Sequence, residues 1–277
     1  MHQSIIELLI CPVCRAEMAL TEDGRSCVCH GTRRHCFDLA KSGYLNLNPP
    51  SGGSGDERAA IRARTCFLEA GYYRPLADRI GEILCEISAQ SVLDAGCGEG
   101  YYTNLLSTGR RMLGVDLSKS GIESAAKSAK ARGLCTGFAV SSLFTLPVRD
   151  GSLDAILNIF APCAEKEFAR ALRDGGYLLL VGAGERHLMG LKQQLYENAY
   201  ENPGRADLPE GMTLVRRERL AYTVTVRGQE HIQALFSMTP YYWRTSAVDR
   251  AKLDPLETLE TELDFDLFLY QSIKKGS

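Results

Sequence analysis

The sequence predicts an α/β protein in which helices cover both faces of a mostly parallel sheet, with a small cysteine-rich module ahead of it. Short apolar runs alternate with helical stretches from about residue 91 to residue 182, a pattern typical of parallel sheets whose two faces are both buried. Five of the ten cysteines lie within the first 36 residues, where apolar residues show no helical periodicity.

Composition limits the class of protein. A chain of 277 residues, 45% of them hydrophobic, can bury one large core and a small appendage. No apolar run approaches the roughly 18 residues that span a bilayer, and the first residues lack the pattern of a signal peptide. We therefore expect a cytoplasmic protein without a membrane partner, in which clustered cysteines bind metal more often than they form disulfides.

The net charge of -2 gives no overall signature of nucleic-acid binding. Between residues 24 and 64, however, seven arginines and lysines stand against three acidic residues. This local excess favours a phosphate-facing patch, although a solvated surface fits the same charges.

The chain divides into three parts. Residues 1–48 are rich in cysteine and turn-forming residues, and 49–56 gather proline, glycine and serine as a linker does. Residues 57–277 form the larger domain, which opens with two predicted helices over 57–87 that break at Gly71.

Strands are predicted at the apolar runs and helices between them. Strand candidates lie at 91–96, 111–117, 136–141, 153–160, 176–182, 219–228 and 260–273, the last with the alternation of an antiparallel strand. Helices are expected near 100–107, 119–131, 164–172 and 228–238.

A glycine-rich loop follows the first of these strands in VLDAGCGEGYYT. Gly96, Gly98 and Gly100 let the backbone turn sharply and a ligand approach closely. The spacing G-x-G-x-G, with Tyr101 in place of a third dinucleotide glycine, disfavours a pyrophosphate site. Asp116 ends the next strand, where a carboxylate accepts hydrogen bonds from the ribose hydroxyls of an adenosine-containing cofactor.

This combination resembles the class I S-adenosylmethionine-dependent methyltransferases from about Ser91 to Tyr177. The resemblance implies a Rossmann-like, mostly parallel sheet, with S-adenosylmethionine as cofactor. By the same resemblance the cofactor is bound by residues of the first three strand ends, namely Asp94, Gly96, Gly98, Glu99, Gly100, Asp116 and Ser141.

NIFAP ends the fourth predicted strand, at the carboxyl edge of the sheet beside the expected cofactor. Asn158 and Phe160 are therefore candidates to hold a planar substrate base, although a strand end with a proline stop explains them equally well. Further aromatic candidates for stacking on a base are Tyr101, Tyr102, Tyr241, Tyr242 and Trp243.

The cysteine-rich module predicts a structural zinc site. Cys11 and Cys14 form a C-x2-C pair, the usual first half of a four-ligand site. For the second half, Cys29 with His35, Cys27 with Cys29, and combinations with His30 or Cys36 all remain open. A segment of some 40 residues cannot bury much of a core, so zinc would supply folding energy.

Motifs along nearly the whole chain resemble the bacterial 23S rRNA (guanine-N1)-methyltransferases, some of which are associated with macrolide resistance. They are CPVC, HCFDLAKSGYLNL, ARTCFLEAGYYRPL, VLDAGCGEGYYT, RHLMGLK and MTPYYW. The resemblance implies Cys11, Cys14 and His35 as zinc ligands. The family's C-x3-H is here Cys29-x5-His35, two residues longer, which leaves the fourth ligand open. Cys29 is favoured because Val28 before it matches the apolar strand residue expected there, with Cys27 as the alternative. The resemblance also implies that Tyr73 and His187 flank the cofactor.

The activity expected from this resemblance is methylation of guanine N1 in a 23S rRNA hairpin loop, with the zinc module presenting the RNA. A class I methyltransferase of a small molecule is the first alternative, and a non-catalytic zinc-ribbon RNA-binding protein is the second. The sequence leaves open which guanine is modified, which group is the general base, whether the chain forms a homodimer, and whether it confers resistance.

Overall fold

An eight-stranded sheet organises the protein. The computed structural model describes residues 1–48, 58–204 and 209–273, so the linker expected at 49–56 lies outside the described residues. The sheet order is β10-β11-β9-β8-β5-β6-β7-β4. Its strands are β4 (Leu45–Asn46), β5 (Ser91–Ala95), β6 (Arg111–Asp116), β7 (Gly137–Val140), β8 (Leu153–Ile159), β9 (Leu172–Ala183), β10 (Met212–Arg227) and β11 (Thr258–Ser272).

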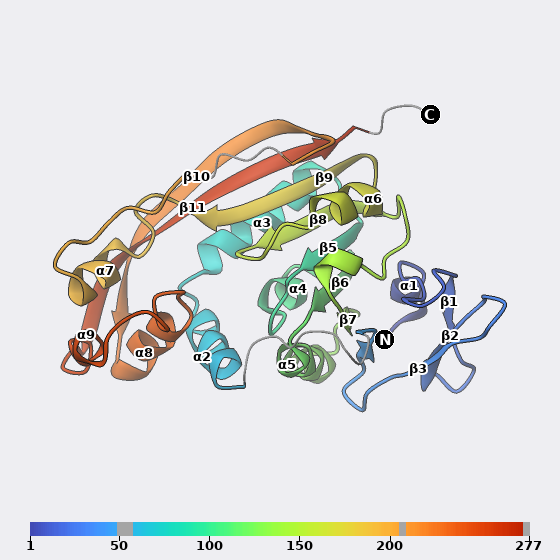
Figure 1. Ribbon diagram of the computed structural model, residues 1–277, viewed down its shortest axis with the longest axis horizontal. Coiled ribbons are helices and arrows are strands. Elements are labelled where there is room, and N and C mark those ends of the chain that lie inside the picture. Colours follow the sequence, from blue (N-terminus) through green and yellow to red (C-terminus); the bar gives the residue numbers. More distant parts are fainter. Residues whose placement is uncertain (49–57, 205–208, 274–277) are drawn as a thin grey trace.

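Strands β4 to β9 run parallel, which confirms the predicted mostly parallel sheet, whereas β11 pairs antiparallel with β9, and β10 pairs antiparallel with β11. The two last strands arch over one side of the molecule in Figure 1. The order reverses at β5, because β6 and β7 extend to one side of it while β8 and β9 extend to the other. Ligands bind at such switch points, at the carboxyl ends of the strands.

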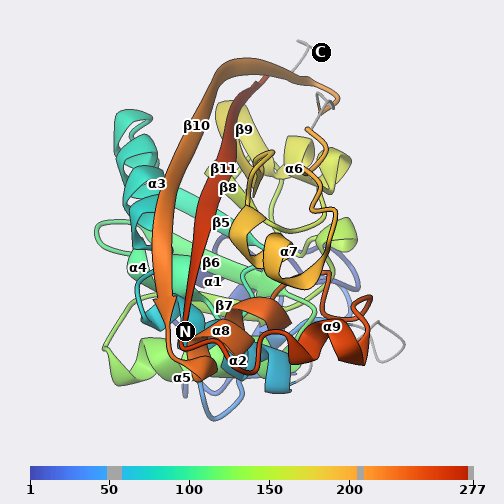
Figure 2. The same ribbon diagram turned by 90° about the vertical axis from the view of Figure 1, so that its left-hand side faces the viewer.

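Helices cover both faces of the sheet. They are α1 (Gln3–Ile6), α2 (Arg58–Glu69), α3 (Arg74–Glu86), α4 (Tyr101–Leu105), α5 (Lys119–Ala131), α6 (Glu165–Ala171), α7 (Met189–Leu195), α8 (Gln229–Ser237) and α9 (Ala247–Ala251). Figure 2 shows α3 on one side of the sheet and α6 and α7 on the other. Within the described residues, no helix has both the length and the apolar character needed to cross a membrane.

Strand residues alternate between the two faces. Leu93, Leu113 and Leu178 join a buried core with residues of α1 and α6. Their neighbours Val92, Met112 and Leu179 join a second core with residues of α2, α3 and α8. Burial on both faces explains why these strands are continuous apolar runs in the sequence.

Most of the predicted elements are confirmed. The predicted strands correspond to β5 to β11, and the helix pair separated at Gly71 corresponds to α2 and α3. The strand expected at 219–228 begins earlier, at Met212. The sequence did not predict α1, α7 or the two-residue strand β4, which pairs with Ala139 and Val140 of β7.

The N-terminal module is a three-stranded antiparallel sheet that also packs against the main sheet. Its strands are β1 (Met18–Leu20), β2 (Ser26–Cys29) and β3 (Cys36–Asp38). Ile5, Ile6 and Leu9 are buried in the same core as Leu113 of β6, and Leu9 forms a β-bridge with Val148. Residues 1–48 therefore contribute to the core beneath the larger sheet.

Shortening Leu9 should destabilise the whole protein. Leu9→Ala removes a fully buried side chain and is expected to lower the free energy of unfolding by about 2–5 kcal/mol, as measured by urea denaturation of the zinc-loaded protein. Val13→Ala, at a position 66% exposed, is the control and should change it by less than about 0.5 kcal/mol. Equal effects of the two variants would contradict the shared core.

Candidate cofactor and substrate site

A cavity of about 1620 Å³ opens at the carboxyl ends of β5, β6 and β8. It exceeds the roughly 300–1,000 Å³ of a pocket for one small ligand, so it has room for a cofactor and a second group. Its lining includes residues of α2, α8, the loop after β5 and the ends of β6 and β8, and also the segments around Tyr200 and Tyr241. This is the switch point at which the fold places a ligand.

The glycine loop requires glycine at each of its three positions. Gly96, Gly98 and Gly100 all have positive φ, at 86°, 53° and 75°, a region that strains other residues. A Cβ on Gly96 would overlap Ala161, and one on Gly100 would lie 2.6 Å from the Cβ of Ala125. The glycines thus serve the turn and close packing, and Gly96 and Gly98 line the cavity.

Asp116 fastens this loop to the end of β6. Its Oδ2 accepts a hydrogen bond from the Gly98 amide at 2.9 Å, and its Oδ1 accepts one from the Ser118 amide at 2.7 Å. The carboxylate lines the cavity, and each of its oxygens has further lone pairs to accept ligand hydroxyls. Leu117, Leu143 and Phe144 add apolar surface beside it, which suits the ribose and adenine of a nucleoside.

Asp94 and Glu99, two more acidic residues at the glycine loop, have raised pKa values. Asp94 accepts a hydrogen bond from the Thr103 hydroxyl at 2.6 Å, and burial raises its pKa to about 6. Burial likewise raises the pKa of Glu99 to about 7, although Arg64 of α2 lies 3.4 Å away and opposes this rise. Such shifts concentrate at functional sites.

Tyr73 and His187 meet at the cavity wall. The Asp264 amide donates to His187 Nδ1 at 3.2 Å, so the neutral ring carries its hydrogen on Nε2. Burial lowers the pKa of His187 to about 4, which keeps the ring neutral. Nε2 lies 3.2 Å from the Tyr73 hydroxyl and donates to it, so the Tyr73 hydroxyl hydrogen remains available to a ligand.

The two substrate candidates at the end of β8 lie in different environments. Phe160 has a positive φ of 52° and is 48% exposed at the cavity, where its ring contacts those of Tyr73 and His187. A strained non-glycine residue of this kind is typical of functional sites. Asn158 is buried below, and its amide nitrogen donates to the carbonyls of Ala95 and Pro162.

Four predicted positions lie outside the cavity lining, namely Gly100, Tyr101, Ser141 and Asn158. The Asn158 side chain braces the loop, and its Oδ1 is buried without a hydrogen-bond partner among the described residues. Ser141 is buried at the end of β7, where its amide donates to the Asp116 carbonyl. Both residues therefore support the elements that carry Gly96 and Asp116.

Four side chains of the N-terminal module converge on one point. The sulfurs of Cys11, Cys14 and Cys29 and a ring nitrogen of His35 all lie within 4.8 Å of one another. The separations are 3.6 Å between the Cys14 and Cys29 sulfurs and 3.4 Å from Cys29 to His35 Nδ1. Tetrahedral zinc with bonds of about 2.0–2.3 Å needs ligand separations of roughly 3.3–3.8 Å, so the donor set and spacing fit this metal.

The structure distinguishes Cys29 from Cys27. The backbone amide of His35 donates to the Cys29 sulfur at 3.1 Å and lowers the pKa of this thiol to about 6, which favours the thiolate that metals bind. Cys27 lies outside the cluster, and burial raises its pKa to about 11. The second half of the cluster is therefore Cys29 with His35.

Several cavity residues were not predicted from the sequence. Arg64, Tyr200 and Asn202 line the cavity, and Lys192 lies behind Tyr200. Helical periodicity could have placed Arg64 on α2 but not its contact with Glu99, 35 residues away. A lysine within the apolar pattern of α7 was the available signal for Lys192.

Comparisons with known proteins agree with this geometry. Residues 93–180 match the family model described as "Methyltransferase domain", and residues 9–51 match the zinc-ribbon model described as "RlmA, N-terminal". The fold and the site thus define a class I S-adenosylmethionine-dependent methyltransferase that carries a zinc ribbon.

Three bacterial relatives match nearly the full length. YxjB of Bacillus subtilis (strain 168), provisionally named a 23S rRNA (guanine-N1)-methyltransferase, is 31% identical over 94% of this chain and 95% of that protein. The 23S rRNA (guanine(748)-N1)-methyltransferase of Streptomyces fradiae is 28% identical, over 91% of each. A Micromonospora griseorubida protein with a provisional name of the same kind is 27% identical, over 88% of this chain and 90% of that one. The chain belongs to the 23S rRNA (guanine-N1)-methyltransferase family.

Replacing Glu99 by Gln should remove a pH-dependent cost of folding. Because its pKa rises from 4.5 to about 7 on folding, the folded protein binds this proton more tightly, and ionisation of Glu99 destabilises the fold as pH rises through that window. The stability of Glu99→Gln relative to wild type should therefore increase between pH 4.5 and 7 and level off above. Thermal unfolding across this range, without cofactor, measures the difference, and a pH-independent difference would contradict the buried Glu99.

Proposed function

We propose that this protein transfers the methyl group of S-adenosylmethionine to N1 of a guanine in a hairpin loop of 23S rRNA. The observation that carries the proposal is one large cavity at the switch point, lined by the glycine loop and Asp116 and also by several aromatic residues. A zinc ribbon in the same chain and membership of the family support it.

S-adenosylmethionine supplies an electrophilic methyl group on a sulfonium. For this chain we assign the cofactor contacts to the loop of Gly96 and Gly98, to Asp116 for the ribose hydroxyls, and to the available Tyr73 hydroxyl, which His187 orients. Glu99, paired with Arg64, completes the set of residues around the cofactor. Asp94, Gly100 and Ser141 hold the glycine loop in place. The protein's contribution is then positioning and exclusion of water.

The acceptor atom explains why an unpaired guanine is required. N1 lies on the base-pairing edge, so a paired guanine must leave its helix before it can react, and a loop lowers that cost. Phe160, at the end of β8, offers a ring against which the base can be held. Arg62 on α2 is exposed at the cavity, where it can meet a phosphate.

For zinc we assign Cys11, Cys14, Cys29 and His35, with the ribbon presenting RNA to the cavity. Arg25, Arg33 and Arg34 are exposed on this module, which suits contact with the phosphate backbone. A cytoplasmic location follows from the substrate, and a homodimer remains a prediction.

The direct test is methyl transfer to protein-free 23S rRNA, followed by mass spectrometry of the nucleosides. The wild type should yield 1-methylguanosine, and Gly96→Ala should not, because the added methyl group overlaps Ala161 at a positive φ. Gly182→Ala, which has open space at its Cβ, is the matched control and should retain activity. A different methylated nucleoside, or methylation of small molecules alone, would overturn the proposal.

Removing one zinc ligand should separate RNA recognition from cofactor binding. Cys14→Ser is expected to lose bound zinc and to lower methylation of rRNA at least tenfold, while the affinity for S-adenosylmethionine stays within about threefold. Elemental analysis, rRNA kinetics and calorimetry provide the readouts. Cys36→Ser, outside the cluster, is the control and should retain zinc. Full rRNA activity in the zinc-free variant would contradict the role in presentation.

A further inference from the structure

Lys192 is a buried cation held by neutral groups. It lies on α7 with no exposed surface, and its Nζ donates to the Tyr200 carbonyl and to Asn202 Oδ1, each at 2.8 Å. Among the described residues no carboxylate forms a salt bridge with it. Burial lowers its pKa, which the more distant charge of Glu201 only partly opposes. Burying a lysine without a paired carboxylate costs free energy, so we expect Lys192 to have a role beyond stabilising the fold.

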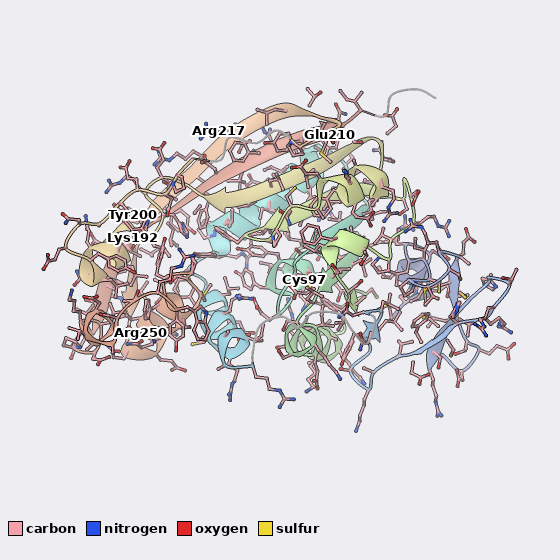
Figure 3. The ribbon with its side chains drawn as sticks, viewed as in Figure 1. Cys97, Lys192, Tyr200, Glu210, Arg217 and Arg250 are labelled. Carbon is pink, nitrogen blue, oxygen red and sulfur yellow. The ribbon has the colours of Figure 1, made fainter. Side chains whose placement is uncertain are left out.

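Two aromatic rings surround this cation. Lys192 Nζ lies 4.6 Å from the centre of the Tyr200 ring and 5.4 Å from that of Tyr241, both within the range of a cation–π interaction. Because Lys192 binds both the ring and the backbone carbonyl of Tyr200, it fixes the position of this side chain. Figure 3 shows Lys192 and Tyr200 next to each other, beside α7.

Asn202 links the same residues to the site. Its Oδ1 also accepts the Tyr241 hydroxyl at 3.3 Å, and its amide nitrogen donates to the Gly184 carbonyl at 2.8 Å and the His187 carbonyl at 3.3 Å. His187 in turn orients Tyr73. The rings of Tyr200 and Tyr241 are thus held in a defined position relative to the rest of the cavity.

Tyr200 lines the cavity at a distance from the glycine loop. Tyr200, Asn202 and Tyr241 line it, and Figure 3 shows Tyr200 well separated from Cys97 in the glycine loop. The Tyr200 side chain is 56% exposed although Lys192 covers part of it. An ordered, half-exposed ring at the wall of a cavity is the kind of surface on which an extruded base stacks.

We propose that Tyr200, supported by Tyr241, is the stacking platform for the target guanine, and that Lys192 is the positioning residue that holds both rings. The inference rests on the proposed function and identifies where its substrate base binds. A cation close to the tyrosine rings draws electron density from them, which favours stacking with guanine, an electron-rich purine.

Steady-state kinetics with 23S rRNA, together with calorimetric titration of S-adenosylmethionine, test the platform. Tyr200→Ala is expected to raise the KM for RNA about tenfold, the loss of one base–aromatic stack, while the Kd for S-adenosylmethionine stays within about twofold. Tyr200→Phe keeps the ring and should restore the RNA KM to within about threefold of wild type. Unchanged RNA KM in Tyr200→Ala, or an equal loss of cofactor affinity, would overturn the platform.

Lys192→Met tests the positioning role, with thermal unfolding measured alongside. The expected result is a raised RNA KM with the Kd for S-adenosylmethionine retained, whereas a lower Tm with unchanged RNA KM would show that Lys192 serves stability only and overturn its part of the proposal. Should the wild type itself make no 1-methylguanosine, the proposed function fails and this inference fails with it. Wild-type turnover with an unaffected Tyr200→Ala overturns this inference alone.

Discussion

The hydrogen bond from the Gly98 amide to the Asp116 carboxylate is the constraint on which the site depends. It ties the loop after β5 to the end of β6, so the two strand ends that flank the switch point act as one surface. The loop can take this path only because three glycines adopt positive φ. Thr103, bound to the buried Asp94, fixes the start of the following helix. The cavity is therefore shaped by backbone geometry that a few side chains hold in place.

Parts of the zinc ribbon pack into the main fold. Residues on either side of the Cys11, Cys14, Cys29 and His35 cluster belong to the main fold: Leu9 pairs with Val148, and Leu45 pairs with Ala139. A metal held by this cluster would add folding free energy to a small module that has little core of its own. Because β4 joins the large sheet and α1 packs against it, the module is held against the methyltransferase fold by packing as well as by the chain.

Most of the fold could be predicted because apolar runs and helical periodicity are local features of the sequence. Strands β5 to β9 are apolar runs buried on both faces, and the helices between them have clear periodicity. Strand β4 was missed because a strand of two residues is too short to show a hydrophobic periodicity. It is defined only by its pairing with β7. The glycine loop and Asp116 were found by spacing. The Asp264–His187–Tyr73 chain joins distant segments and needed the structure. The Lys192–Tyr200 contact spans only eight residues, but it depends on the irregular path of the chain after α7. Spacing alone also left Cys27 and Cys29 open, and the position of the His35 amide separates them.

The proposed reaction requires that one cavity bring a methyl donor to N1 of an unpaired guanine. Methylation at N1 blocks base pairing, so reverse transcription of 23S rRNA treated with the protein should stop one nucleotide short of the modified base. We expect a single new stop, at a guanine in a hairpin loop, that depends on S-adenosylmethionine. A stop within a stable helix, or no stop on RNA that has incorporated labelled methyl groups, would contradict it.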